Sequence, residues 1–288
     1  MFTREKIVLK LLNQLHQPVS KTVFVKLVFL LRHETSLRNM SSFYDFVPYK
    51  YGPFSFTLYR ELDRLMSNGY VREVGDKLAP LPLVASVEPL TSLGKIAIRH
   101  VVGNYGNTSR EAILEDVYRR YPWFALNSEL SQRYFASIEP PLEASPAVYT
   151  SGYEEMSVEA FFNRLLKQGI RLLIDVRANP VSRKYGFAGS RLRQFCERLG
   201  LSYRHEPSVG IPRGERSELN DLASYRRLFR HYEESILSAQ PKKIAELGGI
   251  MSEIPSVLVC FEKDVERCHR GCLASYIAHE SGLRVIHL

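Results

Sequence analysis

The sequence predicts an α/β protein in which a parallel β-sheet with helices on both faces follows a mostly helical domain. Two observations indicate this class. Apolar residues recur at helical spacing through the first half, whereas short apolar strands alternate with amphipathic helices after residue 147. Three prolines within residues 139–147 disfavour a helix there and indicate a linker. We therefore expect one domain over residues 1–140 and a second over residues 147–288.

The first domain is predicted to contain helices followed by a hairpin. Its helices, from the spacing of their apolar residues and from Ser55 as an N-cap, are 6–15, 21–31, 55–66, 92–102 and 109–121. Two short strands around Gly75 predict a two-stranded wing after the third helix. Helix, helix, recognition-type helix and hairpin is the order of a winged helix-turn-helix.

An aromatic segment before the third helix carries a family resemblance. Tyr49-Lys-Tyr-Gly-Pro-Phe-Ser-Phe56, with the helix after it, resembles the antitoxin-related Panacea-type domains of prokaryotic defence and toxin–antitoxin proteins. The resemblance implies a domain that binds DNA or the substrate, or one that binds protein or packs on the catalytic half. The cations placed to contact phosphates are Lys50, Arg60, Arg64, Arg72 and Lys77.

The second domain alternates strand and helix. Its predicted strands are 147–153, 171–177, 201–205, 256–261 and 284–288. The helices predicted between them are 157–168, 190–199, 219–237, 241–252 and 268–281. Repeated strand–helix units predict a parallel sheet of the Rossmann-like kind.

Polar residues follow these strands where each one ends. They are Asp175, Arg177 and Asn179 after the second strand, His205 after the third and Glu262 after the fourth. Cys268, His269 and Arg270 then open a helix, whose N-terminal amides favour an anion. Because the carboxyl ends of parallel strands share one rim, we expect these groups to form one site.

The net charge points to a polyanionic partner. The chain carries +8, and residues 177–230 hold twelve Lys and Arg against five Asp and Glu, eleven of the twelve being arginine. Arginine suits bidentate phosphate contacts, so DNA or RNA is the expected partner. A solvated basic face is the alternative, but this run adjoins the predicted site.

The motifs at the strand ends resemble a known family. Thr150-Ser-Gly-Tyr, Ile174-Asp-Val-Arg-Ala-Asn-Pro-Val-Ser-Arg, Tyr203-Arg-His-Glu-Pro and Val259-Cys-Phe-Glu with Cys268-His-Arg are similar to the bacterial family catalogued as domain of unknown function 488. The resemblance extends over residues 147–288. It implies no activity, so the chemistry has to be argued from the residues.

Hydrolysis of an N-glycosidic bond is the chemistry that these residues favour. It needs a carboxylate to stabilise an oxocarbenium-like sugar and a donor for the departing base. Asp175 or Glu262 is the candidate carboxylate, with His269 or His205 as the donor; an ion pair of Asp175 with Arg177 or Arg270 is the structural alternative. The predicted phosphate ligands are Arg177, Asn179, Arg183, Lys184 and Arg270. The predicted base-stacking rings are Tyr153, Tyr185 and Phe187.

Thiol and metal chemistry are less favoured. Ile174-Asp-Val-Arg is similar to rhodanese-type sulfurtransferases, but neither Cys260 nor Cys268 has an arginine at the spacing of their thiolate loop. Cys260, Cys268 and His269 fit no familiar zinc spacing, and we expect Cys268 and His269 to point apart on a helix. We therefore predict no metal and no cofactor.

The sequence as a whole predicts a cytoplasmic enzyme that acts on double-stranded DNA with a flipped base, in defence against phage DNA or in repair. A DNA glycosylase is the preferred function; a non-catalytic DNA-binding regulator or a nucleotide- or sulfur-handling enzyme is the alternative. No apolar stretch reaches the roughly 18 residues of a membrane span. The four cysteines have no disulfide-framework spacing and are expected to be thiols. A homodimer is compatible with these features.

Overall fold

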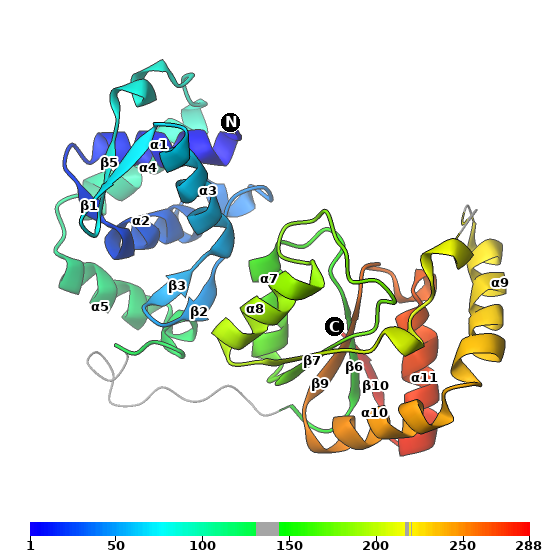
Figure 1. Ribbon diagram of the computed structural model, residues 1–288. Coiled ribbons are helices and arrows are strands. Elements are labelled where there is room, and N and C mark those ends of the chain that lie inside the picture. The colour runs from blue at the N-terminus through cyan, green and yellow to red at the C-terminus, as the bar shows by residue number, and fades with distance from the viewer. Residues whose placement is uncertain (131–143, 217–218, 220) are drawn as a thin grey trace. The chain divides into compact units, whose positions relative to one another are not determined.

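The structure, a computed structural model, describes residues 1–130, 144–216, 219 and 221–288. The chain divides into two compact units, Met1–Pro140 and Pro141–Leu288, each with its own buried core (Figure 1). The division falls in the proline-rich segment 139–147, of which residues 139–143 lie outside the described part of the chain. Among the described residues, no helix has both the length and the hydropathy needed to cross a membrane.

The described residues of the N-terminal unit, 1–130, form five α-helices. They are α1 (Thr3–Gln14), α2 (Lys21–Glu34), α3 (Phe56–Ser67), α4 (Ser92–Tyr105) and α5 (Arg110–Arg120). In four of them, the hydroxyl group of the N-cap residue accepts a hydrogen bond from a free backbone amide of the first turn. At the start of α3, for example, Ser55 accepts from the amide of Leu58. Helix α2 is the centre of this unit, because every residue from Phe24 to Leu31 is buried.

Two small antiparallel sheets complete the N-terminal unit. One has the strand order β1-β5-β4 and the other is the hairpin β2-β3. Their bounds are β1 Val19–Ser20, β2 Val47–Tyr49, β3 Gly52–Phe54, β4 Val71–Val74 and β5 Lys77–Pro80. The strands predicted around Gly75 are therefore present as the β4-β5 pair, whereas the β2-β3 pairing was not predicted from its proline-rich sequence. Gly52 is required there, since its φ is +86° and a Cβ atom would lie 2.4 Å from the ring of Tyr118.

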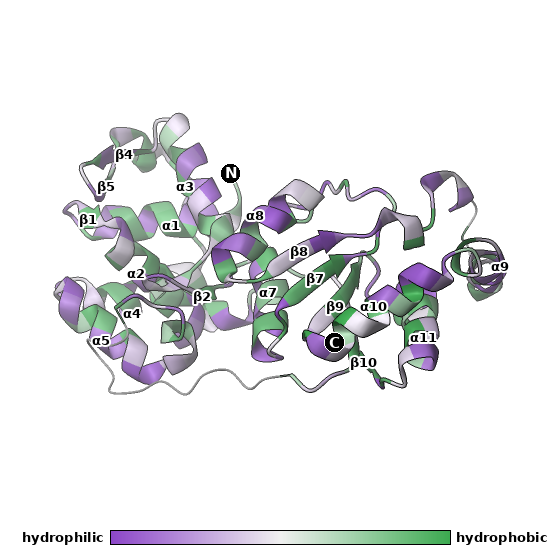
Figure 2. Cartoon of the chain, turned by 60° about the horizontal axis from the view of Figure 1, so that its bottom comes forward, coloured by the Kyte–Doolittle hydropathy of each residue, from purple (hydrophilic) through white to green (hydrophobic). Residues whose placement is uncertain are grey.

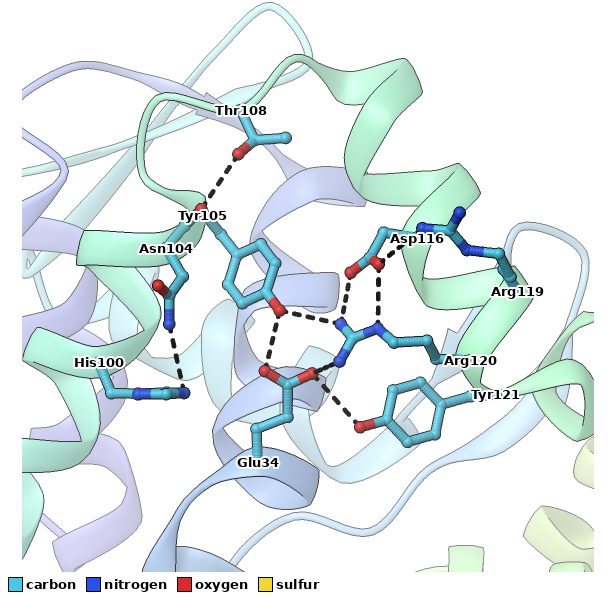
Figure 3. A network of polar contacts seen from close by, with 9 residues as sticks. All are labelled: Glu34, His100, Asn104, Tyr105, Thr108, Asp116, Arg119, Arg120 and Tyr121. Carbon is cyan, nitrogen blue, oxygen red and sulfur yellow. Dashed lines mark hydrogen bonds and ion pairs between the residues drawn. The ribbon is translucent and has the colours of Figure 1, made fainter.

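A polar network joins the end of α2 to α4 and α5 (Figure 3). The carboxylate of Glu34 accepts hydrogen bonds from the hydroxyls of Tyr105 and Tyr121, at 3.0 and 3.3 Å, and pairs with Arg120. Arg120 also donates to Asp116, one turn earlier on α5. Each charged group in this network has its partner inside the unit, which indicates a structural role.

Lys26 fixes the β2-β3 hairpin to α2. Its side chain is only 2% exposed, and its ammonium donates to the backbone carbonyls of Tyr51 and of Pro53, the latter at 3.2 Å. Burial lowers the pKa of Lys26 to about 7, with a smaller contribution from the positive charge of Arg110.

The C-terminal unit contains a five-stranded sheet that is parallel throughout. The strands are β6 (Val148–Gly152), β7 (Leu172–Asp175), β8 (Ser202–His205), β9 (Ser256–Cys260) and β10 (Val285–His287), in the order β10-β6-β9-β7-β8. The predicted parallel, Rossmann-like sheet is thereby confirmed.

Helices cover both faces of this sheet (Figure 1). They are α7 (Val158–Lys167) and α8 (Gly189–Leu199) on one face, and α10 (Pro241–Glu253) and α11 (His269–Ser281) on the other, with α9 (Leu222–Tyr232) beside the second pair. On the second face, Ile174 and Leu258 of the strands pack in one cluster with Leu247 and Ile277 of the helices. Figure 2 shows the hydrophobic character of β7 within this sandwich.

The strand order places four strand ends next to one another, in the order β6, β9, β7 and β8. In the register of the sheet, Gly152 of β6 lies beside Cys260 of β9, and Asp175 of β7 lies beside Val259. His205 of β8 lies on the other side of Asp175. The expectation that the carboxyl ends share one rim is confirmed, and the loops after β6, β7 and β9 leave the sheet as neighbours.

The buried ammonium of Lys26 makes the stability of the N-terminal unit depend on pH. Between the folded pKa of about 7 and the ordinary value of 10.5, the unfolded chain binds a proton that the folded chain does not. This group therefore makes the free energy of unfolding rise with pH in that window, by about 1.4 kcal/mol per unit at most. Lys26→Met should lose this slope in denaturant titrations followed by the fluorescence of Trp123, the single tryptophan.

Lys95→Met, at an exposed position of α4, is the control and should keep the wild-type slope. Parallel pH profiles for wild type and Lys26→Met would show that the ammonium stays charged in the folded unit.

Candidate functional site

A cleft of about 640 Å³ opens at the carboxyl ends of the sheet in the C-terminal unit. Loops that follow β6, β7 and β9 line it, together with the segment 211–216. Its lining residues are Tyr153, Arg177, Ala178, Asn179, Val181, Ser182, Arg183, Ile211, Arg213, Arg216, Cys260, Phe261 and Glu262. This is the place where open α/β folds keep their ligands.

The cleft is cationic, with one carboxylate and an apolar wall. Arg183 and Arg213 are exposed, and the side chain of Arg216 retains 27% of its exposure. Glu262 is the only acidic residue in the lining given above. Phe261 and Val181 are 41% and 75% exposed, which is unusual for large apolar side chains and leaves them free to contact a flat apolar ligand.

Asp175 forms a buried ion pair with Arg177. Its Oδ1 accepts from Nε of Arg177 at 2.7 Å, and its Oδ2 accepts from Nη2 at 2.5 Å and from the hydroxyl of Tyr203 at 2.9 Å. Asp175 is fully buried and Arg177 is 6% exposed. The structure therefore shows the alternative role of Asp175, an ion pair with Arg177. Its carboxylate is occupied by protein donors and does not line the cleft.

Arg177 extends this ion pair to the neighbouring loops. Its Nη1 donates to the hydroxyl of Tyr153 at 2.6 Å and to the carbonyl of Phe187 at 2.9 Å. Burial alone would lower the pKa of Arg177, but the hydrogen bonds and the charge of Asp175 outweigh it and raise the pKa. Arg177 therefore borders the cleft as a rigid charge whose donors are largely used within the protein.

The three predicted base-stacking rings are not open to a ligand in this arrangement. Tyr153 and Phe187 stack on each other with centroids 4.1 Å apart and planes 7° apart, and they are 2% and 0% exposed. Tyr185 is half-buried with its ring 6.1 Å from that of Phe195, outside the cleft lining. Phe261 is instead the exposed aromatic residue of the cleft, and its exposure depends on a loop geometry that no sequence pattern indicated.

Glu262 is held by a residue that the sequence analysis did not single out. Its Oε1 accepts from Nη1 of Arg216 at 3.0 Å, and its Oε2 lies 3.1 Å from the thiol Sγ of Cys260. Burial raises the pKa of Glu262, and the neighbouring Cys260 adds to the effect. The only sequence signal for Arg216 was its place in the arginine-rich segment 177–230. Its pairing with Glu262, 46 positions away, could not be predicted from the sequence.

His269 lies beneath Arg216 and Cys260, with 1% of its surface exposed. Its Nε2 donates to the carbonyl of Val176 at 3.0 Å. Its Nδ1 is then an acceptor, for Nη2 of Arg216 at 2.9 Å, and it lies 3.7 Å from Sγ of Cys260. The carbonyl of Val176 therefore fixes the tautomer and points Nδ1 at the sulfur.

Two thiols approach this histidine. The Sγ atoms of Cys260 and Cys268 and a ring nitrogen of His269 all lie within 4.8 Å of one another, and all three residues are buried. The expectation that Cys268 and His269 point apart is wrong, because Cys268 is the N-cap of α11 with an extended backbone (φ −134°, ψ 129°) and not part of the helix. These three residues are a candidate metal-ligand set.

The pKa values of the two thiols are shifted in opposite directions. Burial alone would raise the pKa of Cys260, but the hydrogen bond from Cys268 and the neighbouring His269 and Arg216 outweigh it and lower the pKa well below its ordinary value. Burial and the proximity of Cys260 raise the pKa of Cys268. The two thiols therefore titrate as an interacting pair, in which a single thiolate is favoured over two.

Three further predicted residues hold backbone around the cleft. His205 shares a hydrogen bond of 2.8 Å between Nε2 and the carbonyl of Arg177, and Lys184 donates to the carbonyl of Tyr153 at 2.9 Å. Arg270 is 2% exposed and donates to the carbonyls of Glu262 and Lys263. Of the predicted phosphate ligands, Asn179 and Arg183 are exposed in the cleft, whereas Lys184 and Arg270 lie outside its lining.

The loop after β9 also packs tightly on β6. A Cβ atom at Gly152 would lie 1.8 Å from the carbonyl oxygen of Glu262. Any side chain at this position would therefore displace the loop that carries Glu262, which explains the glycine in the Thr-Ser-Gly-Tyr motif.

The buried pair predicts that Asp175 contributes to the stability of the C-terminal unit. Asp175→Ala should leave Arg177 buried without its counter-charge and lower the free energy of unfolding by about 3–5 kcal/mol. Urea unfolding followed by far-ultraviolet circular dichroism measures this loss. Glu253→Ala, at an exposed acidic position of the same unit, should change stability by less than about 0.5 kcal/mol. Equal stability of the two variants would contradict the structural role.

Comparison with known proteins supports part of the family resemblance. Residues 157–277 match the family model described as "Domain of unknown function DUF488". No curated protein and no solved structure is significantly similar to the chain. The match does not extend to the N-terminal unit, whose resemblance to Panacea-type domains stays a prediction. The C-terminal part of this chain therefore carries a DUF488 domain over residues 157–277, from α7 into α11, which is shorter than the predicted extent of 147–288.

Proposed function

We propose that the C-terminal unit is a hydrolase that cleaves an N-glycosidic bond in DNA, with Glu262 as its catalytic carboxylate. The observation that carries the proposal is the composition of the cleft. One carboxylate, that of Glu262, lies beside an exposed aromatic ring, that of Phe261, in a lining whose other charged residues are all arginines. A base with its flanking phosphates matches such a lining in shape and in charge.

Glu262 supplies what this reaction needs. Departure of the base leaves positive charge on the sugar, and a nearby carboxylate stabilises that charge and orients the attacking water. Nη1 of Arg216 holds one carboxylate oxygen at 3.0 Å and thereby fixes the orientation of Glu262 in the cleft. Of the two carboxylates considered from the sequence, Glu262 is the one with access to a ligand, because Asp175 is fully buried.

The remaining cleft residues have binding roles in this proposal. Arg183 and Arg213 are exposed and suited to phosphates on either side of an extruded nucleotide, with Asn179 as a further polar contact. Phe261 stacks on the extruded base. The cleft volume of about 640 Å³ is within the range of small-molecule sites, roughly 300–1,000 Å³, so it can hold one nucleotide. His269 supports Arg216 from below, and His205 supports the loop after β7.

The N-terminal unit is proposed to be a winged helix-turn-helix that assists DNA binding. The antiparallel order β1-β5-β4, with three helices placed before and between these strands, supports this topology. Arg60 and Arg64 of α3 are paired with Glu61 and with Glu5, which leaves the exposed wing as the better phosphate contact. The wing cations are Arg72 and Lys77.

A role in cytoplasmic defence against phage DNA with modified bases is part of the proposal, with DNA repair as the related setting. The four cysteines are free thiols, which supports a reducing compartment. A homodimer stays compatible with it. The rival function, a DNA-binding regulator without catalysis, predicts intact activity in cells when Glu262 is neutralised.

Release of free base from DNA tests the proposed reaction. Wild-type protein incubated with unmodified and hypermodified phage DNA should release a base that mass spectrometry detects. Glu262→Gln keeps the shape of the side chain but removes its charge, so release should fall by about 10²–10⁴-fold. Glu266→Gln, at an exposed position of the same loop, is the matched control and should keep activity. Absence of free base with every DNA would sink the proposal.

The cationic lining predicts a salt-dependent contribution to DNA binding. Arg213→Ala should weaken binding and reduce the slope of log affinity against log salt by about 1, as expected when one phosphate contact is lost. Arg267→Ala removes an exposed arginine that pairs with Asp264 outside the cleft lining, and it should leave the slope unchanged. Fluorescence anisotropy of labelled duplex DNA at several salt concentrations measures both slopes. Equal slopes for the two variants would remove Arg213 from the interface.

A further inference from the structure

We infer that Cys260, Cys268 and His269 form a zinc-binding site that opens onto the floor of the cleft. The inference concerns metal binding alone and does not rest on the proposed glycosidic reaction. Two thiolates and an imidazole are the ligands that Zn²⁺ prefers in proteins.

The ligand atoms are close to the geometry that zinc requires. The two Sγ atoms and the ring nitrogen lie within 4.8 Å of one another, and Sγ of Cys260 is 3.7 Å from Nδ1 of His269. A tetrahedral ion with bonds of about 2.0–2.3 Å needs its ligand atoms about 3.3–3.8 Å apart. One of the three spacings is therefore already met, and shifts of about 1 Å suffice for the others.

The surroundings of His269 are those of a metal ligand. Its Nε2 donates to the carbonyl of Val176 at 3.0 Å, and this contact orients Nδ1 toward the sulfur of Cys260. Histidine ligands commonly donate their second ring nitrogen to a carbonyl in this way. The ring of Tyr232 packs edge-on against His269, with centroids 5.5 Å apart.

The three residues also stand on regular structure. Cys260 ends the buried strand β9, Cys268 is the N-cap of α11, and His269 is the first residue of that helix. They are 0%, 1% and 1% exposed. Ligands on a strand end and a helix start are held more rigidly than ligands on a loop, which favours a preformed site.

The fourth coordination position faces the cleft. Cys260 and Glu262 both line the cleft, and Oε2 of Glu262 lies 3.1 Å from Sγ of Cys260. Either this carboxylate or a water molecule can complete the tetrahedron. Three protein ligands with one exchangeable position are typical of a catalytic zinc site, in which the metal activates water or polarises a substrate oxygen.

Arg216 provides the charge balance. Its Nη2 bonds Nδ1 of His269 at 2.9 Å, so a metal must displace this contact, while Nη1 can keep its bond to Glu262. Two thiolates then neutralise Zn²⁺, and Arg216 neutralises Glu262. Binding requires both sulfurs to be deprotonated, since only thiolates ligate the metal.

A disulfide between Cys260 and Cys268 is the competing use of the same two thiols. It would leave no thiolate for a metal, so the two uses exclude each other and one set of measurements separates them.

Metal content of the full-length chain tests the inference. Protein purified with a thiol reductant should contain about one zinc per chain by inductively coupled plasma mass spectrometry. After exchange with Co²⁺, it should show thiolate-to-cobalt charge-transfer bands and the visible bands of tetrahedral cobalt. Cys260→Ser, Cys268→Ser and His269→Gln should each lose the metal and these bands. Cys272→Ser, one turn further along α11, is the matched control and should retain both.

A second measurement on the wild-type chain covers variants that fail to fold. Alkylation of Cys260 and Cys268, mapped by mass spectrometry, should be slow with zinc and should accelerate after chelation, while alkylation of Cys196 should be unaffected. Zinc far below one per chain after incubation with excess Zn²⁺, equal metal loss in Cys272→Ser, or a Cys260–Cys268 disulfide in the reduced preparation would each overturn the inference. All these readouts omit DNA, so their result is independent of the base-release assay.

Discussion

The buried ion pair of Asp175 and Arg177 is the interaction on which the architecture of the cleft depends. Through it, the end of β7 is bonded to Tyr203 of β8, to Tyr153 after β6 and to the carbonyl of Phe187 before α8. A charge pair at this depth is tolerated because hydrogen bonds satisfy both partners. The cleft is therefore positioned by electrostatic contacts within the protein, and the groups left free to meet a ligand lie in front of them.

The loop after β9 is fixed by a different means, its backbone. Arg270 donates to two consecutive carbonyls of this loop, and Gly152 allows the carbonyl of Glu262 to approach β6 closely. The side chains of Phe261 and Glu262 are thereby presented to the cleft without having to hold the loop themselves. Motif residues that look like catalysts in the sequence thus divide into those that support the site and those that face it.

Apolar strands and their glycine-terminated helices were readable from the sequence, because burial on both sides of a parallel sheet imposes a local pattern. The shared rim followed from topology. The division of roles did not, because the burial of Asp175 depends on Tyr203, 28 positions away, and the placement of Glu262 on Arg216, 46 positions away. Cys268 was misjudged because a helix N-cap has no helical periodicity, so spacing along the chain says little about where its side chain points.

Because side chains alternate along a strand, the residues of the site come from both faces of the sheet. Cys260 shares the α10–α11 core with Ile174 and Leu258, whereas Asp175, one residue after Ile174, turns to the opposite layer and meets Tyr203. The site is thus assembled where two separately packed layers reach the same edge. A slip of one residue in β7 or β9 would exchange the contents of the layers, and a slip in β9 would also separate the thiol of Cys260 from His269. An insertion or deletion of one residue within β7 or β9 would therefore dismantle the site, which makes strand register its most exacting requirement.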